Sequence, residues 1–357
     1  MSSNPTNVAP VSWARANGVR DSYIAVIENQ DVDSVHQNEY LKRTSSKPPN
    51  VKQSNEQQLV GDTCWGLQRI SQKESLSTRD PTKTDFTFHL KPLDNPKLVD
   101  VYVIDSGVNV DHHDFGGRAE YLAGCEWGEH ATPDDYSGHG TFVAGIIGGT
   151  RWEVAKSARI YAIKDHSEDD PNEHALKPEA NIIARGISKV IEYAKTTGNP
   201  SIINMSLQAD GPCDVIDKEV KLALEAKIHI VTGAGNESVE VINQSPAGNK
   251  GVLVVAGSDI LDRQPYGSSY GKRVDIFAPG FDITSLRNDS LDGTIPGDGS
   301  SWAVPHAAGV MAYILAKDGN KETETLISEI KARAVHVIES KDEETTNRLL
   351  NTVGLDA

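Results

Sequence analysis

The stretch VDVYVIDSGVN (residues 99–109) joins a nearly continuous apolar run to a single acidic residue at its end. Such a run is typical of a strand that is buried on both faces of a parallel sheet. A carboxylate at the end of a buried strand is unfavourable unless it is hydrogen-bonded or paired. The stretch therefore predicts a central strand that carries Asp105 to its carboxyl end, where open α/β sheets place their functional groups.

Further short apolar runs, each bounded by Gly, Asp or Asn, follow this one along the chain. They predict strands at 159–164, 201–207, 228–235, 251–258 and 273–280. Helical patterns lie between several of them, at 141–149, 180–198 and 214–227. Alternating strands and helices predict right-handed crossovers. We therefore expect an α/β fold of three layers, in which a mostly parallel central sheet is covered by helices on both faces.

The N-terminal part of the chain lacks this alternation. Residues 22–29 (SYIAVIEN) predict one strand, and residues 33–43 predict at most a short helix. Residues 44–58 (TSSKPPNVKQSNEQQ) have the composition of a linker. We therefore expect an N-terminal segment over 1–61 and a single larger domain over 62–357.

Charge and hydropathy exclude several classes of protein. The chain has 357 residues and a formal net charge of −16, which argues against nucleic acids and anionic membrane surfaces as partners. No stretch reaches the ~18 apolar residues that a membrane span needs. The N-terminus shows no signal peptide, because no apolar run follows a basic start. We expect a monomer that is cytoplasmic or otherwise intracellular; secretion stays open if a leader precedes this sequence.

The cysteines indicate neither a disulfide framework nor a metal site. Cys64, Cys125 and Cys213 are odd in number and far apart, and they match neither a disulfide pattern nor a metal-ligand spacing. One disulfide could form, but the spacing does not say between which two. Buried or loop thiols in a reducing compartment are the expectation.

Two further polar residues stand beside predicted strands and helices. The stretch SGHGTFVAG places His139 just before a helix of small residues, with Gly138 and Gly140 allowing close approach. The stretch VTGAGNES places Asn236 after a strand, where its amide can donate hydrogen bonds. Because the carboxyl ends of parallel strands share one edge, both residues are expected to lie near Asp105.

The stretch PGDGSSWAVPHAAGV (296–310) predicts a helix that packs very closely, because most of its side chains are small. Ser301 stands at the start of this helix, where the helix dipole and backbone N–H groups can stabilise an anion. Pro305 is expected near the first turn, where a missing N–H is tolerated. Together with Asp105, His139 and Asn236, Ser301 completes a set of nucleophile, base, orienting acid and oxyanion donor.

Each of these residues also has a purely structural explanation. Asp105 can cap a turn, His139 can be a hydrogen-bonded loop histidine, and Asn236 can be a turn residue. The joint pattern favours catalysis, because a parallel sheet would bring every member to the same edge.

These motifs together resemble those of the subtilases, and within them the proteinase K-like branch. The likeness covers about residues 62–338, and it is carried by VYVIDSGVNVDHHDFGGRAE, GHGTFVAGIIGG, IINMSL, GAGNES, QSPAGNKGVLVVAGSD, VDIFAPG and GSSWAVPHAAGV. The resemblance implies a subtilisin-like three-layer fold. It also implies a serine endopeptidase that acts on polypeptides through an acyl-enzyme.

Carried over residue by residue, the resemblance implies a catalytic triad. Asp105 would orient the imidazole, His139 would be the general base and acid, and Ser301 the nucleophile. Asn236 would donate to the oxyanion. The implied substrate-binding residues are Ser206, Leu207, Gln208, Ala209, Gly235 and Trp302. No cofactor is required, although a structural calcium ion (Ca²⁺) would be held by Asp275 with the carbonyls of Lys250 and Val252.

The sequence departs from the family at several places. Trp302 replaces the usual Met after the nucleophile, and Gln208 and Ala209 replace two wall glycines. We expect Trp302 to narrow the leaving-group side of the groove and Gln208 to narrow the acyl side.

The acidic stretch over 164–181 replaces a glycine-rich segment of the family. It is expected to be a solvated loop, the alternative being a metal site that includes His166 and His174. The N-terminal region carries only the start of an inhibitory prodomain, which predicts an incomplete one.

Two other functions stay open from the sequence. The same fold could serve a biosynthetic pathway, with a small-molecule acyl substrate and weak or no proteolysis. A catalytically silent binding protein is the third reading, which the complete set of triad residues disfavours.

Overall fold

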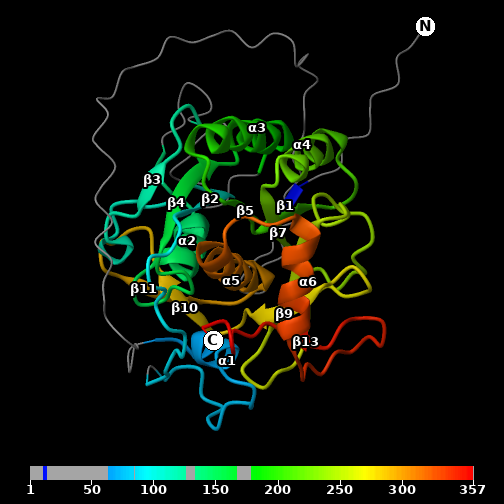
Figure 1. Ribbon diagram of the computed structural model, residues 1–357. Helices are drawn as coiled ribbons and strands as arrows, with labels where there is room; N and C mark the ends of the chain where they lie inside the picture. The colour runs from blue at the N-terminus through cyan, green and yellow to red at the C-terminus, as the bar shows by residue number, and fades with distance from the viewer. Residues whose placement is uncertain (1–10, 14–62, 84, 126–132, 167–177, 357) are drawn as a thin grey trace, which may run out of the picture.

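A computed structural model of the chain describes residues 11–13, 63–83, 85–125, 133–166 and 178–356. Its centre is a nine-stranded sheet with the order β12-β13-β9-β8-β7-β5-β2-β4-β3 (Figure 1). Every pairing in this sheet is parallel except that between β12 and β13. The predicted mostly parallel sheet is therefore confirmed.

The strands of the central sheet are short and mostly buried. They are β2 (Val99–Asp105), β3 (Ala119–Tyr121), β4 (Ala158–Lys164), β5 (Ser201–Met205), β7 (His229–Gly233), β8 (Val252–Ser258), β9 (Ile276–Pro279), β12 (Val335–His336) and β13 (Arg348–Leu349). Two antiparallel pairs lie outside this sheet. They are β1 (Val11–Trp13) with β6 (Leu207–Ala209), and β10 (Ile283–Leu286) with β11 (Thr294–Gly297).

Helices cover both faces of the sheet, as the three-layer expectation requires. On one face lie α2 (His139–Gly148) and α5 (Ser300–Asp318), together with α1 (Trp65–Ile70) and α6 (Thr323–Arg333). On the other face lie α3 (Ala180–Thr197) and α4 (Asp214–Glu225) (Figure 1). A short 3₁₀ helix, η1 (His113–Phe115), follows β2.

The central strand β2 shows why the apolar runs are nearly continuous. Val101 and Val103 belong to the core under α2 and α5, whereas Tyr102 and Ile104 belong to the core under α3 and α4. Successive side chains of a strand point to opposite faces, so a strand covered on both faces needs apolar residues at consecutive positions.

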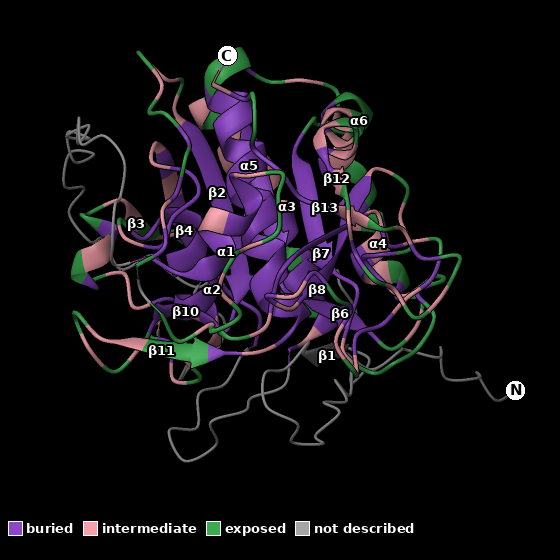
Figure 2. Cartoon of the chain, turned by 90° about the horizontal axis from the view of Figure 1, so that it is seen from below, coloured by how far each residue is buried: buried purple, intermediate pink, exposed green. Residues whose placement is uncertain are grey.

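Helix α5 runs through the interior, and every residue from Ser300 to Ala316 is buried (Figure 2). A Cβ atom on Gly309 would lie 2.5 Å from the Cβ atom of Val154, so only glycine fits there. Pro305 lies inside the helix, one turn after its start, and lacks the N–H that would bond the carbonyl of Ser301. The hydroxyl of Ser206 donates to that carbonyl instead, at 3.0 Å.

Several boundaries differ from the sequence expectation. The strand predicted over 201–207 is divided into β5 and β6, because β6 leaves the central sheet and pairs with β1. His139 does not precede its helix but is the first residue of α2, and Gly138 caps it in the left-handed region at φ +82°. The sequence pattern did not predict the β10–β11 hairpin, β3 or α6.

The predictions for residues 22–29 and 33–43, and for an incomplete prodomain, fall outside the described residues. The division of the chain between 1–61 and 62–357 stays a prediction. None of the described helices is long and apolar enough to cross a membrane.

A buried ion pair fixes α1 to the rest of the domain. The guanidinium of Arg69 has no exposed surface and donates to Asp262 through Nε at 2.6 Å and Nη2 at 3.2 Å. The hydroxyl of Ser75 also donates to Asp262, at 2.6 Å.

We predict that Asp262→Ala lowers the free energy of unfolding by about 3–5 kcal/mol, because it leaves a buried guanidinium without its counter-ion. Denaturant unfolding measures this change. The control is Arg263→Ala, which breaks an exposed pair with Asp259 and should leave the unfolding midpoint almost unchanged. A loss in Asp262→Ala no larger than that of the control would contradict the prediction.

Candidate active site

Asp105 and His139 form the centre of the site. Asp105 ends β2 and is fully buried, and His139 begins α2. The Nδ1 atom of His139 lies 2.8 Å from Oδ1 of Asp105. Because a carboxylate accepts hydrogen bonds, this contact selects the tautomer with the proton on Nδ1, and Nε2 is then the basic nitrogen of the ring.

The pKa of Asp105 is raised to about 6, chiefly because the carboxyl group is buried. The hydrogen bond and charge of His139 and the backbone N–H of Ser106 act in the opposite direction, whereas the Asp165 carboxylate raises the pKa further. Asp105 is therefore half ionised near pH 6, and its charge opposite His139 is lost progressively as the pH falls through that value.

Two glycines allow α2 to approach the end of β2 so closely. A Cβ atom on Gly140 would lie 2.0 Å from the carbonyl oxygen of Gly107 and 3.0 Å from Oδ1 of Asp105. Gly107 has φ +114°, and a Cβ atom there would lie 2.8 Å from the carbonyl oxygen of Asp134. The backbone around Asp105 and the backbone around His139 are therefore in direct contact, with no side chain between them.

Ser301 lies in the first turn of α5 and is buried. Its hydroxyl donates to the carbonyl of Ser206 at 3.2 Å. The next residue, Trp302, packs its indole against the His139 ring with 4.8 Å between ring centroids, and against Phe142 at 3.9 Å. The starts of α5 and α2 are therefore in contact, which brings Ser301 to the edge occupied by Asp105 and His139.

Trp302 does not behave as the sequence suggested. It was expected to border the leaving-group side of the groove, but it is 5% exposed and lies between His139 and Phe142. A Cβ atom on Gly297 would lie 2.8 Å from the indole Nε1, so glycine there makes room for the ring. The indole supports the imidazole instead of narrowing an open groove.

Asn236 follows β7 and faces the start of α5. Its Oδ1 atom accepts a hydrogen bond from the backbone N–H of Ser300 at 3.0 Å. This bond fixes the amide oxygen toward α5, so the amide nitrogen is the atom able to donate to an anion formed beside Ser301. The role of Asn236 as an oxyanion donor stays a prediction.

Gln208 spans the space between β6 and the turn that carries Asn236. Its side chain is hydrogen-bonded to the carboxyl group of Glu237, which also accepts the backbone N–H of Asn236 at 2.7 Å. A Cβ atom on Gly235 would lie 2.2 Å from Nε2 of Gln208 and 2.4 Å from Oε2 of Glu237. Gln208 is only 4% exposed, so its amide fills the space directly over Gly235.

The side chains of three other expected substrate-binding residues, Ser206, Leu207 and Ala209, point into the protein. Leu207 and Ala209 are fully buried in the core under α3 and α4, and Ser206 bonds the carbonyl of Ser301. A substrate beside β6 would therefore meet the side chain of Gln208 and the main chain of its neighbours.

Comparison with known proteins identifies the family. Residues 97–355 match the profile described as the Subtilase family of peptidases. The chain belongs to the subtilase family.

Relatives in fungi agree with this assignment. The chain is 34% identical to a subtilisin-like serine protease of Cochliobolus lunatus over 311 residues, which are 86% of this chain and 58% of that protein. It is 33% identical to a subtilisin-like protease of Arthroderma benhamiae over 90% of this chain and 73% of that one. The chain thus spans little more than half of the Cochliobolus protease.

A solved structure gives the same fold. The crystal structure of a cold-adapted subtilisin-like serine proteinase covers 82% of this chain, and 99% of its own chain is matched. The TM-score is 0.70 and the sequence identity is 31%. The subtilisin-like three-layer architecture is therefore shown.

The calcium site expected for this subtilase does not fit the side chains around Asp275. Arg273 donates through Nη1 to Oδ2 of Asp275 and through Nη2 to the carbonyl of Val252, each at 2.8 Å. Lys331 donates to Oδ1 of Asp275 at 2.7 Å. A guanidinium and an ammonium thus occupy the oxygens that would hold the ion, and a third positive charge there would be repelled.

We predict that Asp275→Asn leaves calcium-dependent stabilisation unchanged. The melting temperature of the parent and of the variant should rise by the same amount on addition of millimolar calcium, although the variant melts lower throughout because it loses two ion pairs. Comparing the increments cancels any calcium bound elsewhere. A smaller increment in Asp275→Asn would restore Asp275 as a ligand.

The alternative metal site receives no support from the described residues. His166 forms a hydrogen bond with Asp165 at 2.7 Å, and His174 lies outside the described residues. Within the described ranges, no group of three His, Cys, Asp or Glu residues could hold a metal ion. The three cysteines are buried, and none of them forms a disulfide in the described part of the chain.

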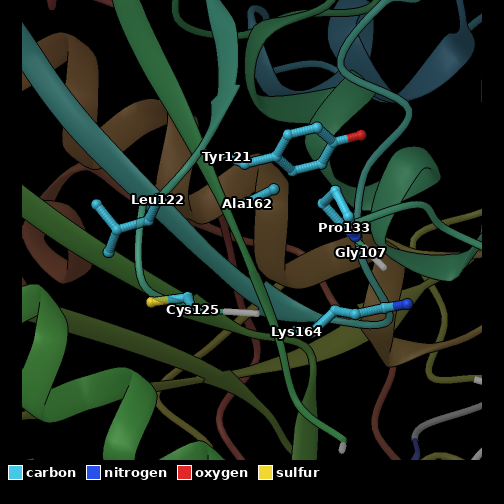
Figure 3. Close-up of a pocket in the computed structure, with 7 residues that line it drawn as sticks. All are labelled: Gly107, Tyr121, Leu122, Cys125, Pro133, Ala162 and Lys164. Carbon is cyan, nitrogen blue, oxygen red and sulfur yellow. The ribbon is translucent and has the colours of Figure 1, made fainter. Parts of the chain in front are cut away.

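A small cavity lies beside the carboxyl end of β2, with a volume of about 10 Å³, room for a single water. In Figure 3, Lys164 extends along it toward Gly107 and Pro133. The cavity is lined by Gly107, Tyr121, Leu122, Cys125, Pro133, Ala162 and Lys164. It is too small for a substrate side chain.

Proposed function

We propose that this subtilase is a serine endopeptidase of the proteinase K-like branch, which cleaves polypeptides through an acyl-enzyme on Ser301. The observation that carries the proposal is the 2.8 Å contact between His139 and Asp105 at the edge where Ser301 and Asn236 also lie. A base that is oriented by a carboxylate, next to a serine and an amide donor, is the arrangement that acyl transfer requires.

The reaction follows from these positions. His139 takes the proton of the Ser301 hydroxyl through Nε2 while the oxygen attacks the scissile carbonyl. Asp105 stabilises the imidazolium that forms, and the amide nitrogen of Asn236 and the backbone N–H of Ser301 donate to the oxyanion. The imidazolium then protonates the departing amine, and water attacks the acyl-enzyme with His139 again as base.

Gln208 supports a preference for small residues on the acyl side of the scissile bond. The acyl carbon must lie between Ser301 and Asn236, next to the space over Gly235. Because the side-chain amide of Gln208 and the carboxyl group of Glu237 meet in this space, a large side chain has no room there unless Gln208 moves. We propose glycine, alanine or serine at this substrate position.

Location, assembly and cofactors complete the proposal. Three buried cysteines without a disulfide support an intracellular, reducing environment. We propose a monomer that needs no cofactor for the reaction, since the described residues already provide nucleophile, base and oxyanion donor.

We predict that Ser301→Ala abolishes covalent labelling by a fluorophosphonate and lowers peptide hydrolysis at least about 10³-fold, because the nucleophile is lost. Intact-mass measurement and a casein assay give the two readouts. Ser300→Ala is the matched control and should still be labelled. Labelling of Ser301→Ala at the parent's rate would mean that another residue is the nucleophile. A parent protein that is labelled but hydrolyses no peptide would favour a small-molecule substrate.

We predict that Gln208→Gly speeds cleavage of peptides with Phe or Leu before the scissile bond about 10-fold or more relative to those with Ala, because the space over Gly235 opens. Comparing kcat/KM for matched peptides measures this. Gln208→Met keeps a long side chain and should bring no such gain. Equal efficiency of the parent on Phe and Ala peptides, with no change in Gln208→Gly, would refute the preference for small residues.

A further inference from the structure

A second carboxylate, Asp135, lies beside the Asp105–His139 pair and is 7% exposed. Its Oδ1 atom accepts the hydroxyl of Ser106 and the backbone N–H of Gly138, each at 2.8 Å. Its Oδ2 atom accepts the backbone N–H and the hydroxyl of Thr141, at 2.8 and 2.6 Å. Four donors and no acceptor fit an ionised carboxylate.

One of these four bonds reaches the residue that follows Asp105 at the end of β2. Ser106 donates its hydroxyl to Asp135 and its backbone N–H to Oδ1 of Asp105, the latter at 2.8 Å. The same hydroxyl accepts the backbone N–H of Gly140 at 3.0 Å. The single hydroxyl proton is directed to Asp135, at 2.8 Å, in preference to Asp105 at 3.3 Å. Ser106 therefore joins the two carboxylates through its own hydrogen bonds.

The other bonds reach the helix that carries His139. Gly138 directly precedes His139, and Thr141 lies in the same first turn of α2. The backbone carbonyl of Asp135 is in turn held by the side-chain amide of Asn288, which follows β10, at 2.7 Å. Asp135 is thus held by Asn288, and it is hydrogen-bonded both to the residue after Asp105 and to the first turn of α2 that carries His139.

We propose that Asp135 is a positioning residue for the reaction: it holds His139 against Asp105, and its negative charge stabilises the protonated imidazole. The inference rests on the proposed peptidase function. A side chain that only capped α2 would bond Thr141 and Gly138, and the bond to Ser106 is the one that a cap does not need.

Several other titratable groups face the Asp105–His139 pair from β4 and β3. From β4 and its end come Asp165, which is paired with His166, and Lys164, whose Nζ atom lies 5.3 Å from the centre of the Tyr136 ring. From β3 comes Tyr121.

The pKa of Tyr121 is raised to about 12 by burial, with Asp134, Asp111 and Asp135 adding to the shift, so it is neutral near pH 7. Of the groups that face the pair, Asp135 is the one bonded to both of its supporting turns. Removing its charge should make His139 less basic.

The experiment is the pH dependence of fluorophosphonate labelling, with the melting temperature measured in parallel. In Asp135→Asn we expect the plateau rate to fall about 10–100-fold and the apparent pKa of the rise with pH to move down by about 0.5–1. Thr141→Val is the matched control, since it removes one hydroxyl donor and keeps the charge and the Ser106 bond. It should lower the melting temperature without moving the apparent pKa.

Ser106→Ala separates the two effects. It removes the bridge between the carboxylates but keeps the charge of Asp135, so the plateau rate should fall while the apparent pKa moves less than in Asp135→Asn. The titration of the His139 ring by proton NMR should show the same order of shifts in all three variants, independently of turnover.

Two results would overturn the inference. A folded Asp135→Asn protein with the parent's plateau rate and pKa shows that Asp135 does not position His139. A change in melting temperature alone, matching that of Thr141→Val, shows a purely structural role. Failure of the parent itself to label at Ser301 is a different outcome, because it removes the proposed peptidase function, and the role of Asp135 in catalysis with it.

Discussion

The hydrogen bond between the His139 ring and the Asp105 carboxylate is the constraint on which the rest of the structure depends. A carboxylate with no exposure to water needs donors in fixed places, and they come from His139 and from the backbone of Ser106. The imidazole comes from the first residue of α2, the helix that touches the end of β2. The contact of Gly140 with Gly107 makes that approach sterically feasible.

The same constraint explains the packing of α5. Its small residues allow it to pass through the interior, and this delivers Ser301 and the ring of Trp302 to the start of α2. The carbonyl that Pro305 leaves without a helical partner is bonded by Ser206, which also accepts the Ser301 hydroxyl through its own carbonyl. Ser301, the proposed nucleophile, and Ser206, which directly precedes β6, are thereby held together by one reciprocal pair of hydrogen bonds.

The family resemblance implied room for a substrate beside Gly235 and a calcium ion at Asp275. Side chains of this chain occupy both places. Gln208 fills the region over Gly235, and Arg273 with Lys331 takes the oxygens of Asp275. The physical principle is the same in both cases. In each place the polar group is hydrogen-bonded to another part of the same chain, which removes the cost of burying it without a partner.

The sequence by itself determined the α/β class and the mostly parallel sheet, because consecutive apolar residues mark strands that are buried on both faces. It also predicted that Asp105, His139, Asn236 and Ser301 lie at one edge of this sheet, from their places after strands and at helix starts. It did not determine that Trp302 turns inward, that Asp135 joins two turns, or that Arg273 and Lys331 donate to the carboxylate of Asp275. Each of these depends on which side chains meet across elements far apart in the chain, and the tertiary structure alone decides that, since packing selects among rotamers that the local sequence leaves equally open.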